Sequence, residues 1–528
     1  MEPKVTMTKV LGNTAFLYQF CEQLGLADLV DGVVPERLQS DCPASNGDIV
    51  TAMVVNRLTS PKPLSKVVDW ATDVGFDDYF PCPAAQLNDD RLARTLDHVY
   101  PYWCQVQERV VLSVVEKYNI DPSVVHYDLT SLMFSGSYEE SELVTYGYSR
   151  DKRPDKKQIT LRLNTSDDEA LPLLWQPLPG NTQDTTTVIQ NFKELQSRFK
   201  GIKLVHVGDR AMFSDDIYKK ADELGIDIIA PLSSSKRLDE IVEQAQREEL
   251  TDVVLGKDQK TIIYRIGEIY VEPKDDLDTP PLRVILVWSK ALAKTKRRTR
   301  DRKISARRQG LQQLKEKLNQ PYYRTRKAIE KKLRKIMTQD PVNDGFQVIL
   351  GGTDHALTLD VVEDETVWAA MDHRDGFYIL GTTLKSEDKS TFEIFELYKR
   401  QYIVEDDFRT LKQDLRIRPM FVHLPERIIG LVHITMLSLL VYSLLEILLK
   451  RNGRPMTGRR LFELLQGMVL YLLLLPDGQL IMGIGPIPPD QLQLLRAIGV
   501  VDPDKWILER VKPKYNLSNK PRNHVKER

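Results

Sequence analysis

The chain has 528 residues, of which 42% are hydrophobic and 28% are charged. This composition excludes a wholly disordered chain, a collagen-like repeat and a disulfide-stabilised miniprotein, and the length predicts roughly three to four domains. The formal net charge is −1, yet residues 290–335 hold 19 Lys and Arg against 3 Asp and Glu, so an otherwise acidic chain carries one basic segment suited to a polyanion.

Residues 1–120 are predicted to form an all-helical N-terminal module. Apolar stretches of helical spacing alternate with turns rich in Pro, Asp, Asn and Gly, and Asn88 stands where it can cap the last helix. The expected helices are residues 13–27, 46–58, 63–73 and 91–118. Such a module binds DNA in some proteins and is purely structural in more of them, and no helix here has the signature of a recognition helix.

From residue 121 onward, short β-rich runs replace the helical pattern. Over residues 121–232 the order is strand, strand, strand, helix, strand, helix, strand. This is the order of an RNase H-like core, an α/β fold with a mixed sheet and helices on both faces, although other α/β folds share parts of it. We expect the first part of such a core here and its second part over residues 376–450.

An inserted domain is expected between the two parts of the core. Residues 233–375 mix β-rich runs with the basic segment, whose second half has helical spacing. Residues 451–528 are expected to form a C-terminal helical region with a basic tail. The 18 residues 428–445 contain no Lys, Arg, Asp or Glu, which meets the minimal length for a membrane span. Because His, Thr and Ser interrupt this run and no comparable second run follows, we expect a core helix and no membrane.

The cysteines and glycines exclude some classes of cofactor. Four scattered cysteines without a C-x2-C pair indicate no structural zinc site and are typical of a reduced, cytoplasmic protein. No glycine-rich phosphate loop of the P-loop type is present in the sequence, so no nucleotide cofactor is expected.

Two aspartates stand in apolar strands. Asp128 lies within the run VVHYDLT, and Asp209 ends the run IKLVHVGD. A carboxylate in a core strand is costly unless it is paired or binds a metal, and hard oxygen ligands suit Mg²⁺ or Mn²⁺. Two such ions about 4 Å apart could serve phosphodiester chemistry. Both aspartates could instead simply end strands or cap turns, and the residues alone leave this alternative open.

The helix expected over residues 391–413 gathers polar groups on one face. At about 100° per residue, the side chains that share this face are Tyr398, Gln401, Glu405, Arg409 and Lys412. Asp406 and Asp407 point away from it. A carboxylate beside two cations suits a metal ligand flanked by phosphate binders. A solvated amphipathic helix with a Glu–Arg pair is the alternative.

The sequence resembles the DDE insertion-sequence transposases of the branch with the Y-x2-R-x3-E-x6-K signature. Tyr398, Glu405 and Lys412 match this signature in spacing. Segments such as LNDDRLARTLDHVY, VVHYDLTSLMFSGSYE, YGYSRDKRPDKKQITL and HVGDRAMFS look like family segments in the family's order, and the resemblance covers most of residues 10–445.

The resemblance implies both a function and a site. It makes Asp128, Asp209 and Glu405 the three catalytic and metal-binding acids of a two-metal Mg²⁺ or Mn²⁺ site. The implied reaction is cleavage at the terminal inverted repeats of the protein's own element, followed by transfer of the 3′-hydroxyl ends into target DNA. The implied partners are these DNAs and a second subunit, as a homodimer on paired ends, and the implied location is the cytoplasm, in association with DNA.

Further DNA contacts are expected outside the helix near residue 400. A basic loop leads into a strand after residue 148, and the basic segment follows later in the chain. The residues expected to contact DNA there are Arg150, Lys157, Lys296, Arg297, Arg298 and Arg300.

One position departs from the family pattern. Gln401 stands where the signature has Arg. Arg400 is adjacent but points to the other side of the expected helix, whereas Arg409 lies on the active face. Two alternatives stay open: Arg409 takes over the phosphate contact, or this copy is a catalytically impaired, transposase-derived DNA-binding protein. Another RNase H-like nuclease is the remaining alternative.

Overall fold

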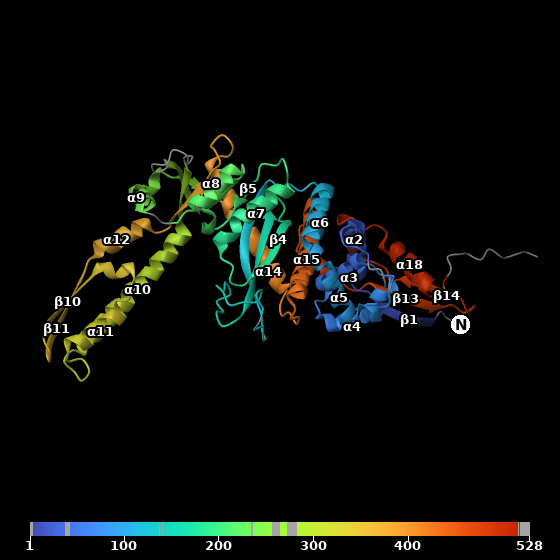
Figure 1. Ribbon diagram of the computed structural model, residues 1–528, viewed down its shortest axis with the longest axis horizontal. Helices are drawn as coiled ribbons and strands as arrows, with labels where there is room; N and C mark the ends of the chain where they lie inside the picture. Colours follow the sequence, from blue (N-terminus) through green and yellow to red (C-terminus); the bar gives the residue numbers. More distant parts are fainter. Residues whose placement is uncertain are drawn as a thin grey trace, which may run out of the picture. The chain divides into compact units, whose positions relative to one another are not determined.

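The computed structural model describes residues 4–36, 43–136, 138–139, 141–233, 236–255, 264–271, 282–515 and 517. The chain forms two compact units, both of which mix helices and strands, so the fold is mixed α/β (Figure 1). The first unit comprises Met1–Ala211, Lys220–Ile226 and Arg400–Arg528, and the second comprises Met212–Lys219 and Asp227–Lys399. The bounds of the five predicted domains stay predictions, and most of the predicted basic tail lies outside the described residues.

Two of the expected N-terminal helices are divided in the structure. The expected helix over residues 13–27 ends at Gly25, whose left-handed backbone (φ 76°) closes the helix. The expected helix over residues 91–118 is interrupted by a 3-10 turn at Tyr100–Tyr102, because Pro101 cannot donate a backbone hydrogen bond. The helices are α1 (Thr14–Leu24), α2 (Leu26–Asp31), α3 (Asn46–Thr59), α4 (Val67–Asp73), α5 (Asp89–Val99) and α6 (Trp103–Tyr118).

The N-terminal module is not all-helical, which corrects the prediction. Strand β1 (Lys4–Val10) pairs antiparallel with β13 (Val469–Leu474), and β13 pairs antiparallel with β14 (Leu480–Ile484). The partner strand of β1 lies at the other end of the chain, so no local pattern reveals the pairing. The C-terminal helices are α16 (Gly458–Leu464), α17 (Pro489–Ala497) and α18 (Pro503–Lys514).

The sheet of the first unit has the strand order β4-β3-β2-β5. Its strands are β2 (Val124–Met133), β3 (Gln158–Ser166), β4 (Pro172–Pro179) and β5 (Val205–Val207). β2 pairs antiparallel with β3 and parallel with β5, and every residue of β3 is buried. Helix α7 (Asp184–Arg198) covers one face, where Tyr127 is hydrogen-bonded to Thr187. Helix α14 (Tyr402–Gln413) covers the other face, where Thr165 donates to Asp407.

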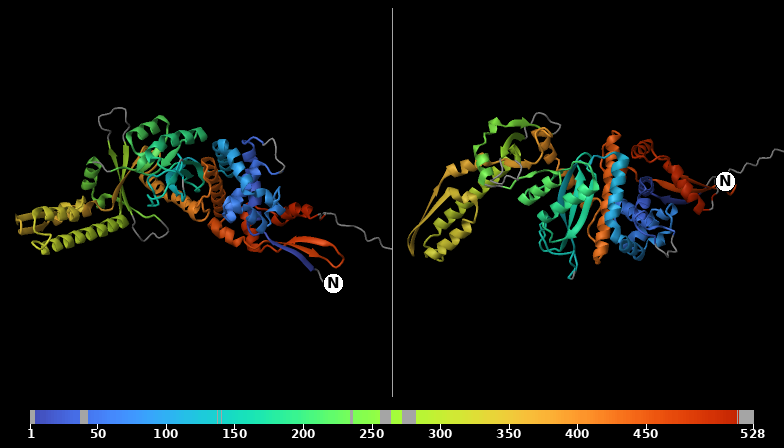
Figure 2. Two further views of the ribbon diagram at one scale, coloured as in Figure 1. Left: turned by 60° about the horizontal axis from the view of Figure 1, so that its bottom comes forward. Right: turned by 45° about the horizontal axis from the view of Figure 1, so that its top comes forward.

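The long apolar helix of the first unit is α15 (Pro425–Arg451). It is long and apolar enough to cross a membrane, with a mean hydropathy of 2.2 over its apolar window, and 94% of that window is buried inside the protein. It lies alongside α6, as both views of Figure 2 show, and it also contacts α3 and α5. This burial agrees with the core helix expected from the sequence.

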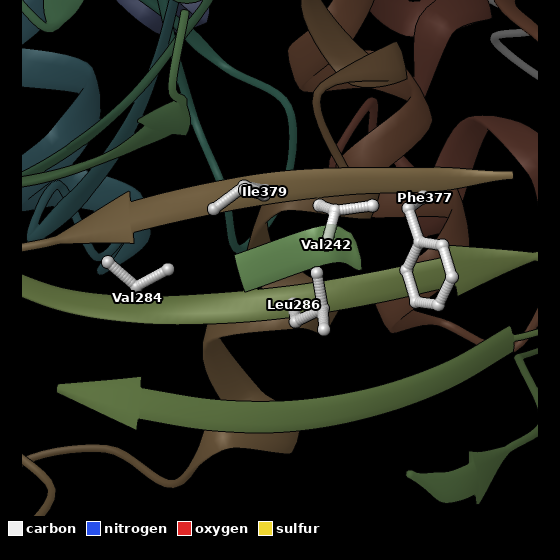
Figure 3. Packing of buried hydrophobic residues seen from close by; sticks show 5 residues of the cluster. All are labelled: Val242, Val284, Leu286, Phe377 and Ile379. Carbon is white, nitrogen blue, oxygen red and sulfur yellow. The ribbon is translucent and has the colours of Figure 1, made fainter. Parts of the chain in front are cut away.

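The second unit is built on an antiparallel sheet with the order β6-β12-β9-β8-β7. Val284 and Leu286 of β9 pack against Phe377 and Ile379 of β12 and against Val242 of α9 (Figure 3). The strands are β6 (Asp227–Pro231), β7 (Thr251–Val253), β8 (Tyr264–Val271), β9 (Leu282–Ser289) and β12 (Phe377–Thr382). The accompanying helices are α8 (Asp215–Glu223), which continues into the first unit, α9 (Lys236–Gln244), α12 (Glu365–Arg374) and α13 (Thr391–Lys399).

The basic segment folds as two helices that contact a β-hairpin. The helices are α10 (Lys290–Glu316) and α11 (Arg326–Ile336), and the hairpin consists of β10 (Phe346–Thr353) and β11 (Ala356–Glu363) (Figure 1). Leu314, Ile329, Leu357 and Leu359 form a shared apolar core. On α11, Ile329 is buried in this core and the half-buried Leu333 and Ile336 pack against it, whereas most cations of the two helices are left at the surface.

Candidate active site

Asp128 lies on the face of β2 that α14 covers. Side chains alternate along a strand, so His126, Asp128 and Thr130 share this face, while Tyr127 and Leu129 take the other. Burial raises the pKa of the Asp128 carboxyl group to about 7, although its Oδ1 accepts a hydrogen bond from Leu129 N at 2.7 Å, which opposes the shift. A carboxyl group poised between its two charge states near neutral pH is typical of a functional site.

Asp209 lies just beyond the end of the strand next to β2. β5 runs parallel to β2 with Val207 opposite His126, and Asp209 follows two residues after the end of β5. Adjacent strands lie about 4.8 Å apart. The Asp209 carboxylate accepts a hydrogen bond from Ala211 N at 2.9 Å, which holds it in a turn after the strand. Its negative charge further raises the pKa of Asp128.

Glu405 approaches from α14, where its side chain is exposed. Its charge also raises the pKa of Asp128, whereas Arg150 lowers that pKa. The structure therefore brings Asp209 and Glu405 into electrostatic reach of Asp128.

The three carboxylates fit a divalent cation by their chemistry. They are hard oxygen donors, and the raised pKa of Asp128 reflects burial and neighbouring negative charge that a cation would offset. Within the residues that the structure describes, no three His, Cys, Asp or Glu side chains surround one point at ligand distance. A complete metal shell therefore requires these carboxylates to move closer together.

The single helix predicted over residues 391–413 is wrong. The structure has two helices, α13 and α14, with the break at Arg400 and Gln401. Polar contacts that both residues make to the sheet of the first unit fix this break. Tyr398 lies before it, in the second unit, with its ring centroid 6.1 Å from that of Tyr378. Tyr398 therefore shares no continuous helical face with the residues of α14.

Gln401 connects the start of α14 to β2 beside Asp128. Its Nε2 donates a hydrogen bond to Tyr127 O at 2.9 Å, and its Oε1 lies 3.0 Å from Nδ1 of His126. The position where the family signature has Arg is thus occupied by an amide that holds the helix of one predicted acid to the strand of another.

A buried contact between His126 and Asp167 supports this connection. His126 is fully buried, and its Nε2 lies 2.7 Å from Oδ1 of Asp167. Asp167 also pairs with Arg400 at 3.1 Å, and Arg400 donates a second hydrogen bond to the Asp167 backbone oxygen at 2.8 Å. Arg400 thus contacts the turn after β3. In a continuous helix it would have pointed away from the active face, but the helix break places it at this turn.

Lys412 is anchored two residues along the strand from Asp128. Its Nζ donates to Thr130 Oγ1 at 2.9 Å and pairs with Asp151 at 3.2 Å. Asp151 also pairs with Arg418 at 2.7 Å. Burial lowers the pKa of Lys412, and the Asp151 carboxylate opposes that shift. The ammonium group therefore has a fixed place on the same strand face as Asp128.

Three further polar residues of α14 had been assigned to faces of the expected helix: Asp406, Asp407 and Arg409. Asp407 is buried and accepts a hydrogen bond from Thr165 at 2.7 Å, away from Glu405. Arg409 is exposed and pairs with Asp406. This pairing engages Arg409 with a residue that was expected to lie off the active face.

The predicted contacts of the basic loop lie in the first unit. Arg150 is half-buried and acts electrostatically on both Asp128 and Lys412. Lys157 donates to the backbone oxygen of Tyr138, and its Nζ lies 5.9 Å from the ring centroid of Tyr146. Both cations therefore belong to the loop region near the acids.

The four predicted contacts of α10 lie in the second unit and differ in exposure. Lys296 and Arg298 are exposed, and the exposed Arg297 lies 3.6 Å from Asp372. Arg300 is only 8% exposed and pairs with Asp372 at 2.7 Å. Arg300 thus serves the internal structure of this unit, which corrects its expected place among the DNA contacts.

Comparison with protein families decides the class of the protein. The family described as "Transposase DDE domain" matches residues 123–441, a range that contains all three acids. The chain belongs to the DDE transposase family. A second family, described as "Domain of unknown function (DUF4277)", matches residues 6–106 of this transposase.

Solved structures show only a distant likeness to this transposase. In a cryo-EM structure of the piggyBac transposase synaptic complex with hairpin DNA, the match has 10% identity, covers 99% of this chain and 88% of that chain, and has a TM-score of 0.37. For the Mos1 transposase paired-end complex with left transposon end, the values are 11%, 37%, 61% and 0.16. No curated protein matches the chain. Scores this low add nothing to the family assignment.

Three residues around the acids of this transposase were missed by sequence reasoning. Asp151 pairs with both Lys412 and Arg418, and Asp167 contacts His126. Asp151 had a usable signal, since an acid inside a basic loop often forms an internal ion pair. The other two carry no local signal, because their partners are remote in sequence.

Proposed function

We propose that this transposase is catalytically competent and cleaves and joins DNA through an RNase H-like core of the Y-x2-R-x3-E-x6-K branch. The observation that carries the proposal is the approach of Asp209 and Glu405 to Asp128, which contributes to the raised pKa of Asp128. The strand order β4-β3-β2-β5, with β5 parallel to β2, supports the RNase H-like assignment.

The residues of the site would act together on one phosphodiester. Asp128 and Asp209 would hold two Mg²⁺ or Mn²⁺ ions from neighbouring strands, and Glu405 would hold them from α14. When bound, the ions would activate a water nucleophile and stabilise the leaving oxygen. Lys412, fixed by Thr130, would place a cation where a DNA phosphate can approach the acids.

The proposed reaction consists of two phosphoryl transfers at each end of the element. Water attacks the phosphorus at the terminal inverted repeat, the bond to the 3′ oxygen breaks, and a free 3′-hydroxyl remains. This hydroxyl then attacks a phosphodiester of target DNA and displaces another 3′ oxygen, so no covalent protein intermediate is needed.

We further infer a homodimer on paired DNA ends. The proposed DNA contacts outside the acids include the basic loop and the exposed part of α10, where cations are concentrated. They are Arg150, Lys157, Lys296, Arg297 and Arg298, together with Tyr398, Gln401, Arg409 and Lys412 near the helix break.

A cleavage assay on the DNA that flanks the reading frame tests the proposal. The purified protein should nick a duplex carrying these flanking inverted repeats in Mg²⁺ or Mn²⁺ and leave free 3′-hydroxyls. With target DNA added, joined products should appear, and EDTA should abolish both. Sequence-specific binding without nicking in either metal would contradict the proposal and favour an impaired, DNA-binding descendant of a transposase.

A further inference from the structure

A cleft of about 600 Å³ in the first unit has no role in the site described above. It lies between the helical module and the segment that follows α14. Its walls include Arg57 and Lys62 from the first of these and Arg416, Arg418 and Phe421 from the second, with two aspartates at the start of α5. The cleft therefore combines several cations with an aromatic ring.

Part of the positive charge of the cleft has no internal counter-charge. Arg418 and Arg427 are each paired with an aspartate, at 2.7 and 2.8 Å. In the part of the chain that the structure describes, no carboxylate pairs with Arg57, Lys62 or Arg416. Arg57, Lys62 and Arg416 are therefore available to an anion from outside the protein.

Arg57 makes the strongest case for such an anion. Burial alone lowers the pKa of its guanidinium group to about 10, so the group stays charged at neutral pH. It donates a hydrogen bond to Arg416 O at 3.2 Å. Arg57 is half-buried, and a partly buried cation without a counter-ion costs free energy, which an anion in the cleft would offset.

The aromatic ring of the cleft is held open to solvent. Phe421 is 66% exposed, although its neighbours in the chain are fixed. Tyr138 donates a hydrogen bond to Val422 O at 3.3 Å, and its ring centroid lies 5.2 Å from that of His423. An exposed aromatic ring in a basic groove is the arrangement on which unpaired nucleic-acid bases stack.

The cleft is connected to the candidate active site through one aspartate. Arg418, which lines the cleft, and Lys412, which lies beside the acids, both pair with Asp151. DNA that passes the acids along this row of cations would therefore reach the cleft next.

We propose that this cleft holds unpaired nucleotides of the DNA end next to the cleavage site, with a base stacked on Phe421 and phosphates near Arg57, Lys62 and Arg416. The inference rests on the proposed function and extends it by naming the form of DNA that the protein recognises. The exposed ring of Phe421 and the continuity with the acids favour nucleic acid over an acidic protein segment.

Binding in EDTA tests this inference independently of cleavage. The full chain should bind a duplex with a short single-stranded 3′ overhang about tenfold more tightly than the blunt duplex of the same sequence. Phe421→Ala should abolish this preference, and Phe421→Tyr should keep it. Lys62→Ala with Arg416→Ala should weaken binding to both duplexes and flatten the log–log salt slope by about 0.7–0.9 per lost phosphate contact. Phe392→Ala and Lys505→Ala alter exposed residues elsewhere and should change neither quantity.

Several results would contradict the inference or the proposed function. A wild-type protein that binds both duplexes equally, or a preference that survives Phe421→Ala, overturns the inference whether or not the protein cleaves DNA. Displacement of the overhang duplex by poly-glutamate at equal phosphate and carboxylate concentration would instead assign the cleft to an acidic protein partner. A preference that is present in a protein without nicking activity would reject the proposed function and leave this inference standing.

Discussion

Gln401, which stands where the Y-x2-R-x3-E-x6-K signature has Arg, makes contacts that connect two elements of the site. The longer Arg side chain of the signature is absent, and an amide donates to Tyr127 O and lies beside His126. These contacts join the strand of Asp128 to the helix of Glu405. The substitution is therefore compatible with an assembled site.

Removal of the Gln401 amide should loosen the site without unfolding the protein. Gln401→Ala should reduce single-turnover cleavage by about tenfold to a hundredfold, as is usual when a residue that orients metal ligands is lost. The apparent Mg²⁺ requirement should rise. An unchanged metal requirement in Gln401→Ala would show that the contacts of Gln401 are not used to position the metal ligands.

The contacts of Arg400 and Arg409 reverse the effects that we expect from replacing them. Arg400 holds Asp167, whereas Arg409 pairs with exposed Asp406. Arg400→Ala should therefore reduce cleavage more than Arg409→Ala does, which reverses the expectation from a continuous helix. A larger loss in Arg409→Ala, measured in the same cleavage assay, would restore Arg409 as the substitute for the missing arginine.

At the scale of the element, α10 carries both a buried structural cation and exposed cations that we propose as DNA contacts. Arg300 is buried and paired with Asp372, while Lys296 and Arg298 are exposed on the same helix. Arg300→Ala should destabilise the second unit by about 3–5 kcal/mol, because it leaves a partly buried charge unpaired. Lys296→Ala with Arg298→Ala should cost less than about 1 kcal/mol and lower the salt slope of DNA binding. Thermal unfolding and salt titrations measure the two effects, and equal destabilisation by both variants would contradict the division.

Helix α15 makes the stability of the protein sensitive to acid. Burial lowers the pKa of His433 to about 3, from an ordinary value near 6.5, so the ring is neutral in the fold. It accepts a hydrogen bond from Trp175 at 3.0 Å and stacks on Trp103, with ring centroids 5.0 Å apart. Because the unfolded chain takes up the proton first, this stability is present above pH 6.5 and is lost as the pH falls toward 3.

Replacement of this ring should remove its share of the acid sensitivity. His433→Gln keeps an acceptor for Trp175 but cannot titrate. The variant should be less stable at pH 7, because the stacking on Trp103 is lost. Its free energy of unfolding should then fall less steeply below pH 6, by up to about 1.4 kcal/mol per pH unit. Parallel slopes in the wild type and the variant, measured by urea unfolding at several pH values, would contradict a neutral buried His433.

Elements were predictable where periodicity is local and were missed where pairing is remote. The order of strands and helices after residue 121 follows from β-rich runs and helical spacing, and the structure has that order. The strand β1 was missed because its partner β13 is near the other terminus. The break between α13 and α14 was missed because polar contacts to the sheet fix it, and helical periodicity contains no trace of them.

At the scale of the whole molecule, the sequence predicted the three acids, but it did not predict the residues that support them. Asp128, Asp209 and Glu405 are far apart in sequence, and the spacing pattern of the family, rather than local propensity, predicted their association. The supporting pairs of Asp151 and Asp167 depend on the assembled sheet and helices, so only the three-dimensional structure reveals them.

The central claim is that these three acids form one metal-dependent site. Single-turnover cleavage of the terminal DNA in Mg²⁺ should fall roughly a thousandfold or more in each of Asp128→Asn, Asp209→Asn and Glu405→Gln. Binding of the same DNA should stay nearly unchanged, and the exposed neighbour variant Asp406→Asn should cleave at close to the wild-type rate. A Glu405→Gln protein that cleaves normally, while Asp406→Asn does not, would contradict the account.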